Sequence, residues 1–462
     1  MSGIRTISPV DGSLVVAMPF LEYTAAEAAV SKAQESLKNW RTMPLVARIT
    51  ILRKAVDYLV SRKKILAEEL TWQMGRPVSQ TAGEIDGMAY RANRMFGLAE
   101  EALADRYEQA PEGHTYFIRR QPLGVVFAIT PWNYPYLTAI NIIVPALVAG
   151  NAVLLKPSPQ TPLVGDSFAE AFTHAGLPAG VFQTLHLSPE NTESFIREAD
   201  INHVGFTGSV ENGAAVERAS AGRFLSVGLE LGGKDAAYVR ADADIPNAVA
   251  SLVDGAFFNS GQSCCGIERI YVANTVYDEF VSAYVEGVKR YKLGNPLDST
   301  TNLGPVVNVA SAERIRSQIA AACAAGATPL IPEGFFPATK EGTAYIAPQV
   351  LVNVNHHMEF MRQETFGPCV GIMPVGSDEQ AIGLVNDSPY GLTASVWSND
   401  PESSMRVMEA FNVGTVYLNR CDALEPALAW TGVKHSGRGC TLSRFGYDAL
   451  TRPKSFNLVL PE

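Results

Sequence analysis

The sequence is short of cysteine, of excess positive charge and of long apolar runs, and each shortage argues against a class of protein. Six cysteines in 462 residues are too few for a disulfide scaffold. They form no CxxC pair and no Cys/His cluster, so we expect no metal site. The net charge of −10 argues against nucleic-acid and anionic-membrane partners. The strongest apolar run, 142–150, is too short to span a bilayer and contains a proline, so it predicts a core helix.

The composition favours a globular protein of a reducing compartment. Hydrophobic residues make up 47% of the chain, enough for a sizeable core, and the length predicts two or three domains or one large α/β unit. The N-terminal MSGIRTISPVDGSL has no apolar signal core. Together with the sparse cysteines, this predicts a cytoplasmic protein.

Alternating strand and helix patterns predict an α/β fold. Residues 45–101 have apolar positions at helical spacing, and we interpret the charges among them as solvated helix faces. From residue 124 onward the alternation predicts a parallel sheet with helices on its faces. Ligands of such sheets bind outside the carboxyl ends of the strands. The predicted strands lie at 123–130, 151–158, 181–187, 201–209 and 223–231.

A second α/β block begins near Lys234 and contains the adjacent Cys264 and Cys265 at the end of a predicted helix. Two other segments read as strands without partners: a hairpin at 107–121 and a tail at 455–462. Because such pieces are not stable alone, we expect them to pair, with another subunit.

Four polar residues near predicted strand or helix ends can carry chemistry, and each also has a structural interpretation. Cys264 follows Gly-Gln-Ser and can be a nucleophile, although a lone buried cysteine is more often inert. Glu230 can be an ion-pair partner or a general base. Asn133 can cap a helix or donate to an oxyanion, and Lys156 can be a surface lysine or bind a hydroxyl or phosphate.

Taken together, nine motifs in order along nearly the whole chain resemble the aldehyde dehydrogenase superfamily. They are PWNYP, LLKPSPQTP, FTGS, LELGGKD, FNSGQSC, ETFGP, YGLTASVWS, GTVYLN and GVKHSGRG. The 34-residue spacing from Glu230 to Cys264 is also the family's. The resemblance implies a Rossmann-type dinucleotide-binding domain (1–105 and 123–232), an α/β catalytic domain (233–450) and oligomerisation elements (106–122 and 451–462). It also implies a homodimer or homotetramer.

The resemblance assigns roles by position. Cys264 is the nucleophile, Glu230 the general base and Asn133 the oxyanion donor, while Cys265 is only a neighbour. The implied reaction is NAD(P)-dependent oxidation of an aldehyde to the acid, through a thiohemiacetal and a thioester on Cys264 that water hydrolyses. The implied cofactor-binding residues are Ile129, Trp132, Lys156, Ser158, Phe206, Ser209, Leu231, Glu364 and Phe366.

The substrate is less well defined by the sequence. The implied tunnel residues are Tyr134, Tyr136, Leu137, Asn141, Ser263, Cys265, Leu424 and Trp430, whose aromatic share favours apolar, aryl or medium alkyl aldehydes. An alternative is an ω-carboxy semialdehyde, which would need an arginine such as Arg91 or Arg94; we interpret both as surface or structural charges. Two further readings are a CoA-acylating relative, which Glu230 argues against, and a catalytically silent paralogue.

The sequence departs from the family pattern at three places. Pro159 stands where many members have a glutamate for the adenosine ribose, and the absence of that carboxylate leaves NADP possible, although we favour NAD. Ile142 and Thr441 stand where many members have a Lys/Glu proton relay, so the proton of Glu230 must leave by water. LSPENTESF replaces a glycine-rich turn, which predicts different backbone contacts to the pyrophosphate.

Overall fold

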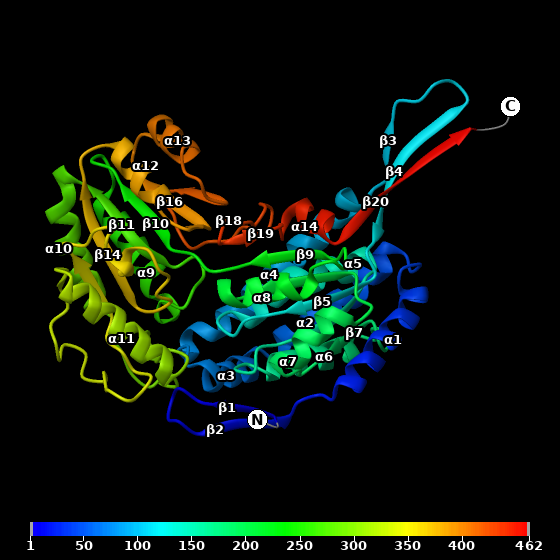
Figure 1. The fold of residues 1–462 in the computed structure, drawn as a ribbon, viewed down its shortest axis with the longest axis horizontal. Coiled ribbons are helices and arrows are strands. Elements are labelled where there is room, and N and C mark those ends of the chain that lie inside the picture. The colour runs from blue at the N-terminus through cyan, green and yellow to red at the C-terminus, as the bar shows by residue number, and fades with distance from the viewer. Residues whose placement is uncertain (1–2, 460–462) are drawn as a thin grey trace.

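The computed structural model describes residues 3–459, so the parts of the predicted cofactor domain at 1–2 and of the oligomerisation tail at 460–462 lie outside the described chain. Figure 1 shows two α/β lobes side by side and a narrow sheet projecting from one of them. The α/β class predicted from the alternating pattern is confirmed.

The first lobe is built on a six-stranded sheet with the order β19-β9-β8-β5-β6-β7, parallel except for β19. Every residue of β5 and β8 is buried, as expected for strands covered on both faces. The strands are β5 (Val125–Ile129), β6 (Ala152–Lys156), β7 (Phe182–Thr184), β8 (His203–Thr207), β9 (Ser226–Glu230) and β19 (Gly437–Arg438).

Helices cover both faces of this sheet because alternate strand residues point to opposite sides. Val126 and Ala128 share a core with α2 to α6 and α14, whereas Val125 and Phe127 share another with α1, α7 and α8. The helices are α1 (Tyr23–Trp40), α2 (Leu45–Ser61), α3 (Lys63–Met74), α4 (Val78–Leu103), α5 (Pro135–Ala149), α6 (Leu163–His174), α7 (Pro189–Glu198), α8 (Val210–Ser220) and α14 (Ser443–Ala449).

The second lobe is built on a seven-stranded sheet with the order β12-β13-β14-β11-β10-β16-β17. Its strands are β10 (Asp235–Val239), β11 (Ile267–Ala273), β12 (Thr328–Pro329), β13 (Gln349–Val352), β14 (Cys369–Val375), β16 (Thr393–Trp397) and β17 (Thr415–Leu418). One face packs on α9 (Ile245–Phe257) and α10 (Tyr277–Val288). The other packs on α11 (Val309–Ala324), α12 (Asp378–Asn386) and α13 (Pro401–Glu409).

Short elements complete the two lobes. Two strand pairs are β1 (Gly3–Ile7) with β2 (Leu14–Pro19), and β15 (Tyr390–Gly391) with β18 (Val433–Lys434). The 3-10 turns are η1 (Phe258–Gly261), η2 (Asn274–Val276) and η3 (Glu359–Met361).

The predicted hairpin and tail strand pair with each other within one chain, and their pairing with another subunit stays a prediction. β4 (His114–Pro122) lies between β3 (Arg106–Glu108) and β20 (Thr451–Val459) in a three-stranded sheet. The rings of Phe117 and Phe456 stack across the β4–β20 pair with centroids 4.3 Å apart. We call this projecting sheet the arm (Figure 1).

The C-terminal part of the predicted catalytic range lies with the first lobe. β19 extends the first sheet because Gly437 pairs with Glu230 at the end of β9. α14 packs on α4 and α5, and the Tyr447 hydroxyl donates to the Met95 carbonyl. The structure therefore brings residues 437–449 beside Glu230.

Candidate active site

Cys264 lies on a tightly held turn between α9 and β11. Asn259 and Ser260 adopt positive φ angles of 54° and 57°, which interrupts the helix before the cysteine. Gln262 fixes the turn through its side chain, which donates to the Asn259 carbonyl and accepts from the Val307 N–H. A Cβ at Gly261 would come within 2.3 Å of the Gly367 carbonyl oxygen, so this position requires glycine. The turn thus presents Cys264 in a fixed place.

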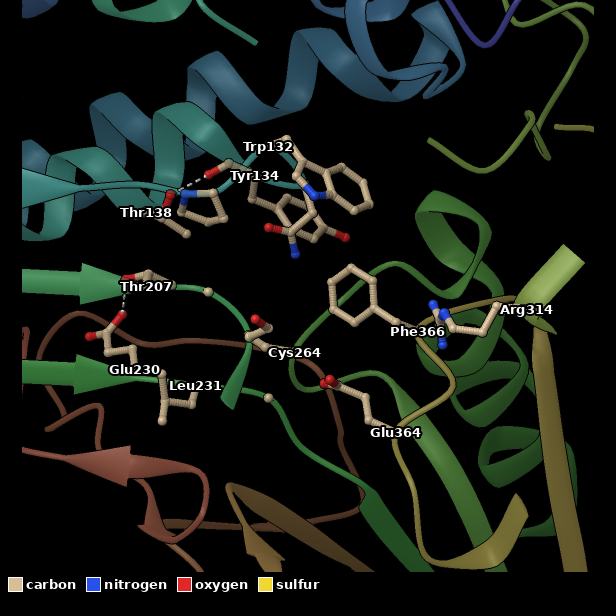
Figure 2. A pocket seen from close by; sticks show the side chains of 15 residues that line it. Trp132, Tyr134, Thr138, Thr207, Glu230, Leu231, Cys264, Arg314, Glu364 and Phe366 are labelled. Atoms are coloured by element: carbon tan, nitrogen blue, oxygen red, sulfur yellow. Dashed lines mark hydrogen bonds between the residues drawn. The ribbon is translucent and has the colours of Figure 1, made fainter. Parts of the chain in front are cut away.

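Cys264 borders a cavity of about 330 Å³ between the two lobes. Figure 2 shows Cys264 between Glu230 and Thr207 on one side and Phe366 and Glu364 on the other. Asn133 and Glu230 line the same cavity, so the structure brings together the three residues predicted to be catalytic.

Asn133 is buried and is held by three neighbours, of which Gln262 bonds its side-chain amide. One amide hydrogen donates to the Gln262 carbonyl at 3.1 Å, and its backbone carbonyl accepts from Arg76 and Asn259. A primary amide has two N–H donors. The second donor of Asn133 is therefore available to an oxygen atom in the cavity.

A buried ion pair that the sequence did not reveal supports Asn133. Arg76 and Glu84 are 1% and 3% exposed and bond to each other. Glu84 also accepts from the N–H groups of Tyr136 and Leu137 at the start of α5, at 2.8 and 3.3 Å. Our interpretation of the charges in 45–101 as solvated is wrong for this pair, because helical periodicity does not distinguish a paired buried charge from an exposed one.

Glu230, at the end of β9, accepts two hydroxyl hydrogen bonds. One oxygen accepts from Thr441 and the other from Thr207 at 3.1 Å, the latter drawn in Figure 2. Burial raises the pKa of the Glu230 carboxyl above its ordinary value, and the two hydroxyl donors oppose this rise. A carboxyl with a raised pKa is a stronger base than an exposed one, which suits proton abstraction from water.

The cofactor-side residues fall into two groups. Trp132, Ser209, Leu231, Glu364 and Phe366 line the cavity at Cys264, with the Trp132 and Phe366 rings edge to face at 5.7 Å. Burial raises the pKa of Glu364 to about 8. The remaining predicted residues lie at or just after the carboxyl ends of neighbouring strands of the first sheet: Ile129 on β5, Lys156 and Ser158 at β6, and Phe206 on β8.

This edge of the sheet fits a dinucleotide. The Lys156 ammonium group makes no hydrogen bond within residues 3–459, and burial lowers its pKa to about 8, so it would gain from a ribose hydroxyl or phosphate. Ser209 caps α8, accepting from the Asn212 N–H at 3.3 Å, and the N-terminus of such a helix favours an anion. In place of the glycine-rich turn, Ser188 caps α7 through the Asn191 N–H.

A second buried ion pair positions the loop that carries Glu364 and Phe366. Lys234 and Glu268 are 1% and 4% exposed and bond to each other. Glu268 also accepts from the N–H groups of Thr365 and Phe366, each at 2.8 Å. We predicted a role for neither residue, although Lys234 lies inside the LELGGKD motif and Glu268 follows the FNSGQSC motif by four residues.

A second cavity of about 300 Å³ lies on the other side of Cys264 and Glu230. Its lining includes seven of the predicted tunnel residues: Tyr134, Leu137, Asn141, Ser263, Cys265, Leu424 and Trp430. Tyr136 does not belong to it. The Tyr136 side chain lies on another face of α5, where it is 1% exposed and packs against Phe168.

Three charged residues that we did not assign to this cavity also line it: Arg91, Asp254 and Asp422. Arg91 lies in the wall and donates to the Leu137 carbonyl and the Asn141 side chain, at 3.0 and 3.2 Å, so our interpretation of Arg91 as a structural or surface charge is incomplete. Asp422 accepts from the Cys265 thiol at 2.8 Å, and burial raises its pKa to about 7. Arg94, in contrast, is exposed beside Glu425.

Known proteins resemble this chain over nearly its whole length. A model described as "Aldehyde dehydrogenase family" matches residues 1–456. The chain is 34% identical to a probable succinate-semialdehyde dehydrogenase [NADP(+)] of Synechocystis sp., over 96% of this chain and 97% of that protein. It is 33% identical to a 2-hydroxymuconic semialdehyde dehydrogenase of Pseudomonas sp., over 94% and 91%. A solved structure of indole-3-acetaldehyde dehydrogenase with NAD+ superposes with a TM-score of 0.92 at 31% identity, covering 99% and 94%.

Proposed function

Because this chain belongs to the aldehyde dehydrogenase family and oxidises aldehydes to carboxylic acids with NAD or NADP, we propose that Cys264, Glu230 and Asn133 carry out the chemistry. The observation that supports these roles is that all three line one cavity, with Cys264 and Glu230 also bordering the second. A CoA-acylating or catalytically silent protein would not need this arrangement around Glu230.

The Cys264 sulfur attacks the aldehyde carbon and forms a C–S bond. The free N–H of the Asn133 amide and the Cys264 backbone N–H stabilise the resulting oxyanion; losing one such donor costs about 3–4 kcal/mol of transition-state stabilisation. NAD or NADP, when bound near Trp132, Glu364 and Phe366, supplies the hydride acceptor for the oxidation.

Glu230 completes the cycle by hydrolysis of the thioester on Cys264. It takes a proton from a water molecule whose oxygen bonds to the acyl carbon, and the C–S bond breaks with its electron pair left on sulfur. The carboxylic acid leaves, and Cys264 returns as a thiolate.

The preferred substrate, in this proposal, is a short aldehyde whose far end carries a carboxylate. Arg91 supports it because the guanidinium lines the second cavity, uses only one nitrogen, Nη1, in its hydrogen bonds within residues 3–459, and stays charged. Two further carboxyl groups, of Asp254 and Asp422, line the same cavity. Asp422 is already bonded by Cys265 and Ser263, and its pKa of about 7 leaves its charge incomplete near neutral pH. Burial also raises the pKa of Asp254. Two similar proteins are named as semialdehyde dehydrogenases, one for succinate semialdehyde and one for 2-hydroxymuconic semialdehyde, which also supports this proposal.

Uncharged aryl or alkyl aldehydes are the second candidate. Leu137, Leu424, Trp430 and Phe258 form an apolar part of the same cavity wall, which favours a chain without a charged end.

A matched pair of substrates separates these candidates. We expect succinic semialdehyde to be oxidised with a higher kcat/KM than butanal, which has the same length and no carboxylate. Arg91→Leu should lower kcat/KM for the semialdehyde about 10- to 100-fold, the value of one charge-assisted hydrogen bond, and change butanal little. Arg94→Leu, on the exposed face of the same helix, is the control. Equal losses for both aldehydes, or a wild-type preference for butanal, would contradict the carboxylate proposal.

We also propose that the protein works in the cytoplasm as a homodimer or homotetramer. All six cysteines are free thiols, which supports a reducing compartment. Among the described residues no helix is long and apolar enough to cross a membrane. The arm supports assembly because it exposes apolar side chains such as Tyr107 and Val459.

A further inference from the structure

A third cavity, of about 200 Å³, lies over β8 and β9, between these strands and the helices α5 and α14. Alternate residues of a strand share a face, so the cavity floor consists of cross-strand pairs that point the same way. These pairs are His203 with Ser226, Gly205 with Gly228, and Thr207 with Glu230. The middle pair has no side chains, and the two adjacent glycines leave a hollow between the outer pairs.

Ile142, from α5, covers one of these glycines and leaves the other open. A Cβ at Gly205 would lie 2.8 Å from the Cδ1 atom of Ile142, whereas a Cβ at Gly228 would meet only the His203 ring, at 3.8 Å. Leu450 adds a second apolar side chain to the wall. The open space over Gly228 therefore has a flat floor of backbone and apolar side chains beside it.

The polar groups at the two ends of the cavity are already paired. At the inner end, the hydroxyls of Thr207 and Thr441 both donate to Glu230. At the outer end, Arg438 is exposed and pairs with Glu217 at 2.9 Å. Neither end therefore offers a charge without a partner to a ligand in the cavity.

His203 is the polar side chain of the lining that lacks a partner. It is 4% exposed, and its ring makes no hydrogen bond within residues 3–459. The Nε2 atom points over the glycine pair, since it lies 3.5 Å from the place of a Cβ at Gly205. Burial lowers the pKa of His203 to about 4, so near pH 7 the ring is neutral and one nitrogen is free to accept a hydrogen bond. A ligand that donates to this nitrogen would satisfy a buried polar group.

The size and lining of the third cavity match one aromatic ring. An apolar protein cavity of about 150 Å³ binds benzene, and this cavity is somewhat larger. We propose that the third cavity binds a small neutral phenol, whose ring lies over Gly228 against Ile142 and Leu450 and whose hydroxyl donates to His203. Ser226, which is exposed and also lines the cavity, gives it access to solvent.

A bound phenol would contact Glu230, because Glu230 lines all three cavities. It would keep water away from this side of the carboxyl group and raise its pKa further, since apolar surroundings disfavour the carboxylate. More of Glu230 would then be protonated near neutral pH and unable to take a proton from water. Occupancy should therefore lower kcat without competition with aldehyde or cofactor, an effect that rests on the proposed role of Glu230 as general base.

Calorimetry of the intact protein with phenol and toluene tests the site directly. The two molecules have nearly the same size, but only phenol can donate a hydrogen bond. We expect phenol to bind about 10-fold more tightly than toluene, the contribution of one hydrogen bond. His203→Phe keeps a ring at this position and should weaken phenol binding about 10-fold while leaving toluene binding unchanged. Equal affinities of phenol and toluene for the wild type would overturn the assignment to His203.

Two variants that fill space locate the bound phenol. Gly228→Val fills the third cavity and should abolish phenol binding, whereas Leu424→Trp narrows the second cavity and should leave phenol binding intact. Circular dichroism checks that both variants fold, and His203→Phe decides the question if Gly228→Val does not. Binding that is lost in Leu424→Trp and kept in Gly228→Val would place phenol in the second cavity and overturn the inference. Absence of binding to the wild type at millimolar concentration would also overturn it.

Steady-state kinetics test the effect on Glu230. Phenol should lower the kcat of the wild type, leave the KM values for aldehyde and cofactor unchanged, and not inhibit Gly228→Val. A raised KM for aldehyde, or binding without loss of kcat, would overturn the effect on Glu230. Glu230→Gln should still bind phenol in calorimetry, so wild-type turnover of that variant would overturn the proposed function and leave the phenol site standing.

Discussion

The two adjacent cysteines differ in their surroundings, which decides what each can do. Cys264 borders both reaction cavities, whereas Cys265 is 3% exposed and donates its thiol hydrogen to Asp422. The pKa of Cys265 is raised well above its ordinary value by the neighbouring Cys264 and by burial. Since the thiolate is the nucleophile, Cys265 is kept in its unreactive form.

We therefore predict that Cys264→Ala abolishes aldehyde oxidation, because it removes the reacting sulfur. Cys265→Ala should retain the activity within about fivefold, because it removes one sulfur from the cavity wall but no reacting group. Steady-state production of NADH or NADPH measures both. Cys265→Ser, which can still donate to Asp422, is the matched control. A folded Cys265→Ala protein without turnover, beside an active Cys264→Ala, would reverse the assignment.

Single residues could be predicted where a motif lies at the end of a strand or on a turn, because such strand ends and turns meet at one edge of the sheet. That is why Cys264, Glu230 and Asn133 could be selected from the sequence and lie together in the structure. Arg76 could not be selected, because its partners Glu84 and Asn133 become neighbours only through packing of α4 and α5. The sequence shows that Arg91 is charged, but it does not show that the Arg91 side chain lines a cavity.

At the scale of elements, apolar periodicity predicted the strands and helices of the first lobe, because a buried parallel strand is a short apolar run between glycine-rich turns. β19 is two residues long and has no pattern to detect. Its place beside β9 follows from pairing across more than two hundred residues of chain, as does the contact of Thr441 with Glu230.

The position of the loop from Glu364 to Phe366 depends on the buried pair Lys234–Glu268, because Glu268 accepts two backbone N–H groups of this loop. Substitutions in this pair can test that dependence. Glu268→Gln keeps an oxygen for the N–H groups of Thr365 and Phe366 but leaves the Lys234 ammonium buried and unpaired, which costs about 3–5 kcal/mol. We expect a lower urea midpoint for unfolding and weaker NAD or NADP binding, measured by fluorescence and calorimetry.

The double variant Lys234→Met with Glu268→Gln is the control for that prediction. It removes the unpaired charge and should recover part of the lost stability, because an apolar side chain fills the site of the buried ammonium group. If the double variant is less stable than either single variant, the pair does not act through its charges.

At the scale of the whole molecule, the arm is the feature least explained by a single chain. Its β4 strand has partners on both sides, yet within residues 3–459 the outer edges of β3 and β20 are not paired further. Apolar side chains lie exposed along it, with Tyr107 at 66% and Val459 at 69% exposure. Open strand edges with exposed apolar residues are surfaces that proteins normally cover.

We predict a particle of two or four chains of 49.8 kDa each, held through the arm with two-fold symmetry. Deleting residues 455–462 removes most of the β20 pairing to β4, so it should shift the assembly toward single chains and lower its melting temperature. The deletion removes no residue that lines the two cavities at Cys264. Val459→Glu should weaken assembly by placing a charge on the arm. Val46→Glu is its matched control, because Val46 is 75% exposed on α2, away from the arm. Light scattering at micromolar concentration measures each particle mass. A single-chain mass for the intact protein, or equal effects of the two valine variants, would show that the arm does not hold the assembly together.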